Sequence, residues 1–318
     1  MRIVFMGTGE IALPTLRWLL SDENPGEVVG ICTQPDKKIG RKQVLVAPEV
    51  KQLGIAAGIE VIQPGSLRKE PESIEKLREL GPDLIVVMAY GQILPRTVLE
   101  LPPKGCVNLH ASLLPRHRGA SPIQAAIRDG DEISGITLMH VVPKLDAGDM
   151  ILKETTPILP DDTGGSLHDK LADLGPRLLA RGLPLLAEGT ASAEPQDESQ
   201  VTYAGKLERD DGVIDWNRDA SSIERLIRAY APWPGTTTSL DLNGETKKLK
   251  IFPPVEVIPG SESAPGTLAT EGERLIVSCG QDQLALTGDL QLEGRKRLPV
   301  ADFLRGTNLP SGTVLGEG

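Results

Sequence analysis

The stretch Arg2-Ile3-Val4-Phe5-Met6-Gly7-Thr8-Gly9-Glu10 decides the fold of this 318-residue chain. An apolar run leads directly into a glycine-containing turn, and the turn leads into a helical pattern over residues 10–20. A buried strand, a tight turn and a helix form the opening of a βαβ unit. The same alternation continues downstream, with strands expected at residues 2–6, 27–33, 60–62, 83–88 and 106–110, and helices at residues 10–20, 48–57 and 72–80. This order predicts an α/β fold with a Rossmann-like, mostly parallel sheet that is covered on both faces.

Beyond residue 120 the pattern changes twice. Helices are expected at 121–129 and 166–188, where Pro176 and Pro184 must kink or divide the second one, and strands at 135–142 and 150–157. Small, polar and acidic residues then dominate around residues 190–199. Short strands follow, with Asn243-Gly244 as a hairpin signal between two of them. We therefore expect a catalytic domain over 1–189, a linker over 190–208 and a smaller C-terminal, OB-like β-barrel domain over 209–318.

Composition excludes several classes of protein. The formal charge is −10 and the pI is about 5.1, which argues against a non-specific nucleic-acid coat and against a basic membrane-surface protein. Cys32, Cys106 and Cys279 are far apart, so they predict neither a disulfide framework nor a cysteine metal site. No apolar run is long enough to span a membrane. We expect a cytoplasmic protein that requires no metal.

The strand expected at 106–110 carries two candidate catalytic side chains, and a later loop carries a third. Asn108 and His110 are two positions apart, so on a strand they point to the same face. Asp146 can join them from the loop Leu145-Asp146-Ala147-Gly148-Asp149. An amide can stabilise an oxyanion, an imidazole can move a proton, and a carboxylate can orient that imidazole and stabilise its charged form. The three side chains together suit acyl transfer to an amine.

These residues lie in the runs Asn108-x-His110-x-Ser112-Leu113-Leu114-Pro115 and Leu145-Asp146-x-Gly148-Asp149, which resemble the signature of the folate-dependent formyltransferases. The resemblance implies 10-formyltetrahydrofolate as co-substrate. It also implies a folate slot between the loop at 90–94 and the segment at 142–146. The folate-binding residues that it implies are Tyr90, Gly91, Gln92, Ile93, Leu94, Ser112, Leu113, Leu114, Pro115 and Val142.

A long polar loop over residues 34–46 carries several cations. It resembles the loop with which family members that act on tRNA approach the acceptor stem. The motifs around Gln196-Asp197-Glu198, Val201–Ala204 and Pro232-Trp233-Pro234-Gly235 resemble the linker and second domain of the same branch. The resemblance implies initiator methionyl-tRNA as the partner, and we expect a monomer. Cations on a loop and on a strand would contact its phosphates, and the expected contacts are Lys37, Lys38, Arg41, Lys42, Lys247, Lys248 and Lys250.

Other motifs receive structural interpretations. Gly7-Thr8-Gly9 invites a dinucleotide-binding assignment, but the second strand ends without the acidic residue that would hold a ribose. We interpret these glycines mainly as a tight turn. His117 is expected in an exposed basic loop with Arg116 and Arg118, His140 on an apolar strand, and His168 on a helix.

Three alternatives remain open at this point. The first is a formyltransferase that acts on a sugar nucleotide or a small amine, since such an enzyme would share the N-terminal motifs. The second is a nicotinamide-dependent dehydrogenase, suggested by Gly7 and Gly9. The third is a non-catalytic tRNA-binding module that retains an inert Rossmann-like domain.

Overall fold

The computed structural model describes residues 1–40, 42–242, 244–310 and 312–316. The chain divides into two compact units, each described here by itself. Unit 1 comprises Met1–Pro122, Ile133–Pro157 and His168–Ala204, and unit 2 comprises Ile123–Glu132, Ile158–Leu167 and Gly205–Gly318. Residues 190–204 belong with unit 1, and the linker expected over 190–208 stays a prediction.

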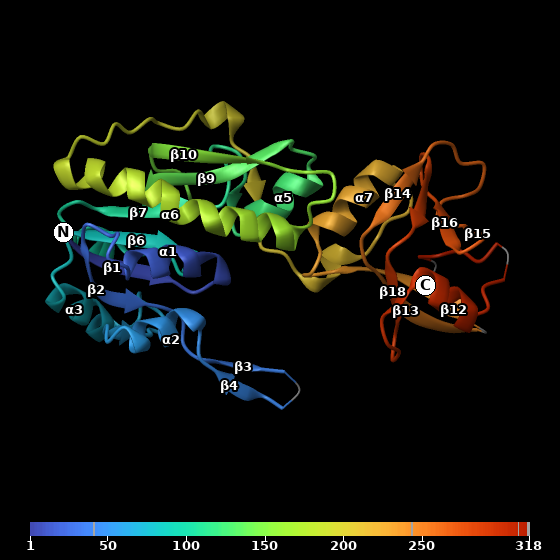
Figure 1. Cartoon of the computed structure of the whole chain (residues 1–318), viewed down its shortest axis with the longest axis horizontal. Coiled ribbons are helices and arrows are strands. Elements are labelled where there is room, and N and C mark those ends of the chain that lie inside the picture. The colour runs from blue at the N-terminus through green and yellow to red at the C-terminus, as the bar shows by residue number, and fades with distance from the viewer. Residues whose placement is uncertain (41, 243, 311, 317–318) are drawn as a thin grey trace. The chain divides into compact units, whose positions relative to one another are not determined.

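Unit 1 is built on a seven-stranded sheet in the order β10-β9-β7-β6-β1-β2-β5 (Figure 1). Its strands are β1 (Arg2–Gly7), β2 (Glu27–Cys32), β5 (Val61–Ile62), β6 (Leu84–Met88), β7 (Cys106–His110), β9 (Ile133–His140) and β10 (Met150–Pro157). The first five run parallel to one another, whereas β9 is antiparallel to both β7 and β10. The predicted Rossmann-like, mostly parallel sheet is confirmed.

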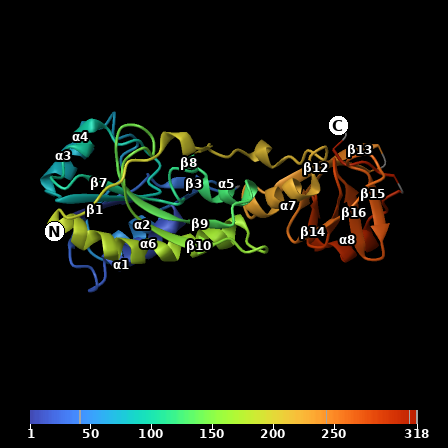
Figure 2. The same cartoon turned by 90° about the horizontal axis from the view of Figure 1, so that it is seen from above.

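Helices cover both faces of this sheet, as a parallel sheet requires. The helical elements of unit 1 are η1 (Glu10–Ala12), α1 (Leu13–Leu19), α2 (Glu49–Ala56), α3 (Pro71–Glu79), α4 (Arg96–Leu99) and most of α6 (Gly164–Glu188). Apart from its first residue, α5 (Pro122–Arg128) belongs with unit 2. Val4 and Ile85 pack in one hydrophobic cluster with Leu77 of α3 and Val98 of α4. Figure 2 shows α3 and α4 on that side of the sheet and α1 and α6 on the other.

Helix α6 runs unbroken through both of its prolines, so of the two outcomes expected from Pro176 and Pro184, a kink or a division, the division does not occur. Its buried leucines hold it against the sheet along its length. Gly182 lies so close to Leu138 of β9 that an added Cβ would approach its side chain to 2.4 Å. Tertiary packing therefore outweighs the hydrogen bonds that the two prolines remove.

Residues 34–46 contain more structure than the predicted polar loop. Lys37–Ile39 (β3) and Val44–Val46 (β4) pair as an antiparallel hairpin that projects from the rest of unit 1 (Figure 1). The exposed fractions of Val44, Leu45 and Val46 are 55%, 62% and 40%. Three consecutive exposed apolar side chains are unusual on a hairpin that carries cations.

The β part of unit 2 consists of two antiparallel four-stranded sheets that share one core. The first contains β12 (Thr236–Leu242), β13 (Glu245–Ile251), β18 (Asp289–Leu292) and β19 (Leu298–Pro299), and the second contains β14 (Val255–Ile258), β17 (Gln283–Leu286), β16 (Arg274–Ser278) and β15 (Leu268–Glu271). Side chains of α7 (Ala220–Ala229) and α8 (Val300–Gly306) fill the same core. The predicted C-terminal β fold is confirmed, while Asn243 of its expected hairpin turn lies outside the described residues.

No helix within the described part of the chain combines the length and the apolar character that crossing a bilayer would need.

Candidate active site

Strand β7 presents Asn108 and His110 at the carboxyl end of the parallel strands. It pairs with β6 through Val87 and Asn108, and with β9 through Met139 and Asn108. Cys106 packs in the cluster on the α3 and α4 side. Because side chains alternate along a strand, Asn108 and His110 face the same side as Cys106. Asn108 is partly buried and His110 is buried, so the imidazole is held in place by the protein.

The contacts of His110 fix which of its nitrogens carries the proton in the neutral ring. Nε2 lies 2.9 Å from the carbonyl oxygen of His117, which can only accept a hydrogen bond. Nε2 therefore donates, and Nδ1 keeps its lone pair. Nδ1 lies 3.8 Å from Oδ2 of Asp146, which is within the reach of an ion pair once the ring is protonated. The ring thus offers a basic nitrogen beside a carboxylate.

Asp146 is held by the main chain around it. Its Oδ2 accepts a hydrogen bond of 2.8 Å from the backbone N–H of Gly119. Its own φ is +47°, in the left-handed region that non-glycine residues adopt only when their surroundings impose it. Gly148, two residues on, passes so close to the carbonyl of His140 that a Cβ would approach its oxygen to 1.8 Å. The loop of Asp146 therefore has a conformation that its neighbours dictate.

The segment Arg116-His117-Arg118 is not the exposed basic loop that the sequence suggests. Only Arg116 is exposed, while His117 is buried and the exposed fraction of Arg118 is 0%. Arg118 donates from Nε to Oε1 of Gln196 and from Nη2 to Oε1 of Glu198, both at 2.9 Å. A buried guanidinium needs such partners, because burial of an unpaired charge is costly.

Residues 196–202, which the sequence assigned to a linker, supply these partners. The Oγ1 of Thr202 accepts from the backbone N–H of His117 at 2.8 Å. The short strand β11 (Tyr203–Ala204) then pairs in parallel with β8 (Arg118–Gly119). The acidic and amide residues of this stretch stood out in the sequence, but no local pattern says that they meet a buried arginine.

The residues expected around folate divide into buried and accessible groups. Tyr90, Leu94, Ser112 and Leu114 are buried, while Gly91, Gln92, Ile93, Leu113, Pro115 and Val142 are partly or fully accessible. The Tyr90 hydroxyl lies 3.2 Å from Sγ of Cys32, so its ring belongs to the core and only its main chain borders the loop. Val141 packs against the same cluster as Tyr90 and Leu94. The loop at 90–94 and the start of the 141–149 loop therefore lie in one neighbourhood.

The glycines at the end of β1 form a tight turn against β6. A Cβ on Gly7 would approach the Met88 carbonyl oxygen to 2.9 Å, and the Thr8 hydroxyl donates to the carbonyl of Tyr90 at 3.1 Å. Asp36, the nearest acidic residue after β2, forms an ion pair of 2.8 Å with Lys51. Hydrogen bonds from Lys51 and then Gln63 lower the pKa of Asp36. These contacts favour a structural role for the glycine turn and for Asp36.

The cations expected to contact tRNA lie at the surface, apart from one that the structure does not cover. Lys37 and Lys38 are exposed on β3 and Lys42 in the turn that follows, while Arg41 lies outside the described residues. Lys248 and Lys250 are exposed on β13, and Lys247 pairs with Glu245 at 2.9 Å.

The three cysteines are free and buried. Burial raises the pKa of Cys32 to about 11 and those of Cys106 and Cys279 to about 12. Protonated thiols are poor nucleophiles, so these residues pack rather than react. Among the described residues, no group of three or more His, Cys, Asp or Glu side chains is arranged to hold a metal ion.

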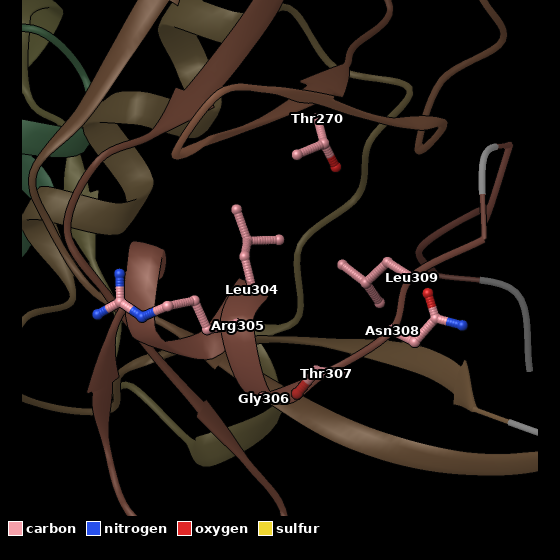
Figure 3. Close-up of a pocket in the computed structure, with 7 residues that line it drawn as sticks. All are labelled: Thr270, Leu304, Arg305, Gly306, Thr307, Asn308 and Leu309. Atoms are coloured by element: carbon pink, nitrogen blue, oxygen red, sulfur yellow. The ribbon is translucent and has the colours of Figure 1, made fainter.

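A cavity of about 520 Å³ lies in unit 2, lined by Thr270 and by residues 304–309 (Figure 3). None of the residues expected to bind folate or to act in catalysis lines it. Leu304 and Leu309 are its apolar members, and Arg305 at its rim pairs with Asp302 of its own helix.

Family comparisons match most of the chain. Residues 1–183 match the family model described as "Formyl transferase", and residues 206–308 match "Formyl transferase, C-terminal domain". A methionyl-tRNA formyltransferase of Akkermansia muciniphila is 50% identical over 308 residues, covering 96% of each chain. A methionyl-tRNA formyltransferase of Geotalea daltonii is 48% identical over 318 residues, covering 100% of this chain and 99% of its own.

A solved structure shares the fold at low sequence identity. The N-formyltransferase from Helicobacter canadensis, in complex with folinic acid and dTDP-3-aminofucose, has a TM-score of 0.64 and is 17% identical. The match covers 89% of this chain and 98% of that one. At that identity the likeness concerns the fold alone.

Proposed function

This chain belongs to the formyl transferase family, among the methionyl-tRNA formyltransferases, and from that membership we propose that it formylates the α-amino group of methionine on initiator tRNA. The co-substrate is 10-formyltetrahydrofolate. The observation that carries the proposed site is the approach of Asp146 Oδ2 to 3.8 Å from His110 Nδ1. It joins a carboxylate from the Asp146 loop and a basic nitrogen from strand β7 beside the amide of Asn108, which is the set that acyl transfer to an amine needs.

His110 is the proton-transfer residue of this proposal. Its Nδ1 is the free basic nitrogen, because Nε2 is occupied by the carbonyl of His117. As the methionine nitrogen attacks the formyl carbon, Nδ1 accepts the amine proton, directly or through a water. The same proton then goes to the folate nitrogen as the bond from that nitrogen to the formyl carbon breaks. Asp146 stabilises the imidazolium that exists between the two transfers.

Asn108 stabilises the negative charge that develops during the reaction. Attack on the formyl carbon places negative charge on the formyl oxygen, and the side-chain N–H groups of Asn108 donate to it. An amide fixed on a strand needs little reorganisation as that charge develops, which is how a preorganised donor accelerates acyl transfer.

Binding of the two substrates uses different surfaces. The accessible residues Gly91–Ile93, Leu113, Pro115 and Val142 border the folate slot of this proposal, while buried Leu94, Ser112 and Leu114 shape its loops. Ser112 supports this division, since its hydroxyl donates to the carbonyl of Arg116 at 2.7 Å. The lysines of the β3–β4 hairpin and of β13 supply the positive charge that meets tRNA phosphates.

The test is a transfer assay with labelled 10-formyltetrahydrofolate and two kinds of acceptor amine. We expect label to appear on methionyl-tRNA and not on an amino-sugar nucleotide. Transfer to the sugar nucleotide alone would contradict the proposal and favour the first alternative. The dehydrogenase and the inert-module alternatives are set aside by the family to which the chain belongs.

A further inference from the structure

The loop that presents Asp146 is tied to the segment at residues 194–198 by the side chain of one residue. Gln196 donates from Nε2 to the carbonyl oxygens of Asp146 and of Gly148, each at 2.8 Å. Its Oε1 accepts the hydrogen bond from Nε of buried Arg118. All polar atoms of this carboxamide are therefore used, and both donor bonds end on the main chain of the Asp146 loop.

We infer that Gln196 is a positioning residue of the formyl transfer site, which holds Asp146 where its carboxylate faces His110. The inference rests on the proposed function, since it assigns Gln196 a part in that site. Gln196 contacts neither reacting group in this scheme. It acts through the backbone of Asp146.

The conformation of Asp146 is one that needs such support. A φ of +47° is unfavourable for a residue with a side chain, and it persists when the surroundings over-determine it. Gly119 fixes only the carboxylate, through its N–H to Oδ2. Gln196 fixes the main chain on either side of Ala147, so the two contacts together set both the position and the direction of the side chain.

The segment that carries Gln196 is itself anchored, so it can act as a fixed support. Glu194 and Met150 exchange two backbone hydrogen bonds of 2.8 Å, which joins the segment to the start of β10. On the other side, Glu198 bridges Arg118 and Lys144, with 2.9 Å to each. Hydrogen bonds from Lys144 and then Arg118 lower the pKa of Glu198, so it stays ionised at neutral pH. Lys144 lies on the same loop as Asp146, so a second contact ties that loop to this segment.

The experiment compares substitutions at Gln196 with a matched control at Gln200. Gln196→Met preserves the length of the side chain and removes its hydrogen bonds. Gln200→Met is the same change on the same segment, at an exposed residue whose amide donates to Oδ2 of Asp197 at 2.8 Å. We expect Gln196→Met to lower kcat about tenfold, with the KM for each substrate within about twofold of wild type, and Gln200→Met to leave both unchanged. A kcat in Gln196→Met equal to that of the control would overturn the inference.

A second variant distinguishes the acceptor oxygen of the carboxamide from its donor nitrogen. Gln196→Glu keeps an oxygen for Arg118 but places a carboxylate oxygen, which cannot donate, opposite the carbonyls of Asp146 and Gly148. We expect it to fold with a melting temperature close to wild type and to lose kcat as Gln196→Met does. Wild-type turnover in Gln196→Glu would contradict a role through the Asp146 loop.

A double-mutant cycle decides whether Gln196 acts through Asp146. In an Asp146→Ala background, with residual rates measured at high enzyme concentration, Gln196→Met should change the rate by less than about twofold. An undiminished tenfold loss there would show that Gln196 acts elsewhere. If the wild-type protein fails to formylate methionyl-tRNA, both the proposed function and this inference are wrong. An active wild type with an insensitive Gln196 overturns the inference alone.

Discussion

Two regions of the molecule carry ionisable side chains that differ in burial. One is the segment from His110 to Arg118 in unit 1, and the other is strand β13 in unit 2. In unit 1 the imidazoles of His110 and His117 and the guanidinium of Arg118 are buried, while Lys248 and Lys250 of β13 are exposed. Burial of such groups is costly unless their partners are in place, so the first region has a fixed geometry. Exposed lysines gain their main partner only when a polyanion arrives. The first arrangement suits chemistry, and the second suits binding.

The largest effect is expected from His110→Ala. Loss of a positioned proton-transfer group costs about 10²–10⁴ in rate, so kcat should fall by that order while binding of a folate analogue persists. Rapid-quench kinetics and fluorescence titration measure the two quantities. Because His110 is buried, a melting curve must accompany them. A His110→Ala variant that is folded and keeps most of its turnover would mean that the buried region does not carry the chemistry.

Asp146→Asn should have the next largest effect. The substituted side chain keeps an oxygen for the N–H of Gly119, so the loop is preserved and only the negative charge beside His110 is lost. We expect kcat to fall on the order of 10², since the imidazolium loses its counter-charge. The melting temperature should change little. A large drop in stability with unchanged kcat would assign Asp146 a structural role instead.

Substitutions in the β3–β4 hairpin should act on binding. Lys37→Ala combined with Lys38→Ala should raise the KM for methionyl-tRNA about tenfold, leave the KM for folate unchanged, and reduce the salt dependence of kcat/KM by about one unit of slope for each lysine. The matched control is Lys69→Ala with Lys76→Ala, two exposed lysines elsewhere in unit 1. Equal effects of the two pairs would mean that general charge, and not the hairpin, attracts tRNA.

A smaller effect is expected from Lys248→Ala with Lys250→Ala. The Glu293 carboxylate accepts from the backbone N–H of Lys248, and Glu245 pairs with Lys247 on the same strand, so acidic groups offset part of the positive field of β13. The KM for tRNA should rise only about two- to fourfold at moderate salt. A larger rise in this KM than in the hairpin variant would mean that β13 contributes more to tRNA binding than the β3–β4 hairpin does.

Local sequence patterns predicted the sheet and the shared face of Asn108 and His110 on β7, because strand alternation is a short-range property. The catalytic role of these residues with Asp146 stays a prediction. The bounds expected for Cys106–His110 and Met150–Pro157 coincide with β7 and β10. The burial of Arg118 was missed, since its partners Gln196 and Glu198 lie far along the chain and no local pattern pairs them. The sequence left open whether the prolines kink or divide α6 for a similar reason, because packing against the sheet decides its continuity.

The proposed site assigns formyl transfer to methionyl-tRNA to Asn108, His110 and Asp146 together. Its most direct test is a single-turnover measurement with labelled 10-formyltetrahydrofolate, comparing wild type with Asn108→Ala at saturating tRNA. We predict transfer about 10²–10³ times slower in the variant, as loss of one oxyanion donor produces, with a wild-type melting temperature. A transfer rate in Asn108→Ala close to that of wild type would contradict the account.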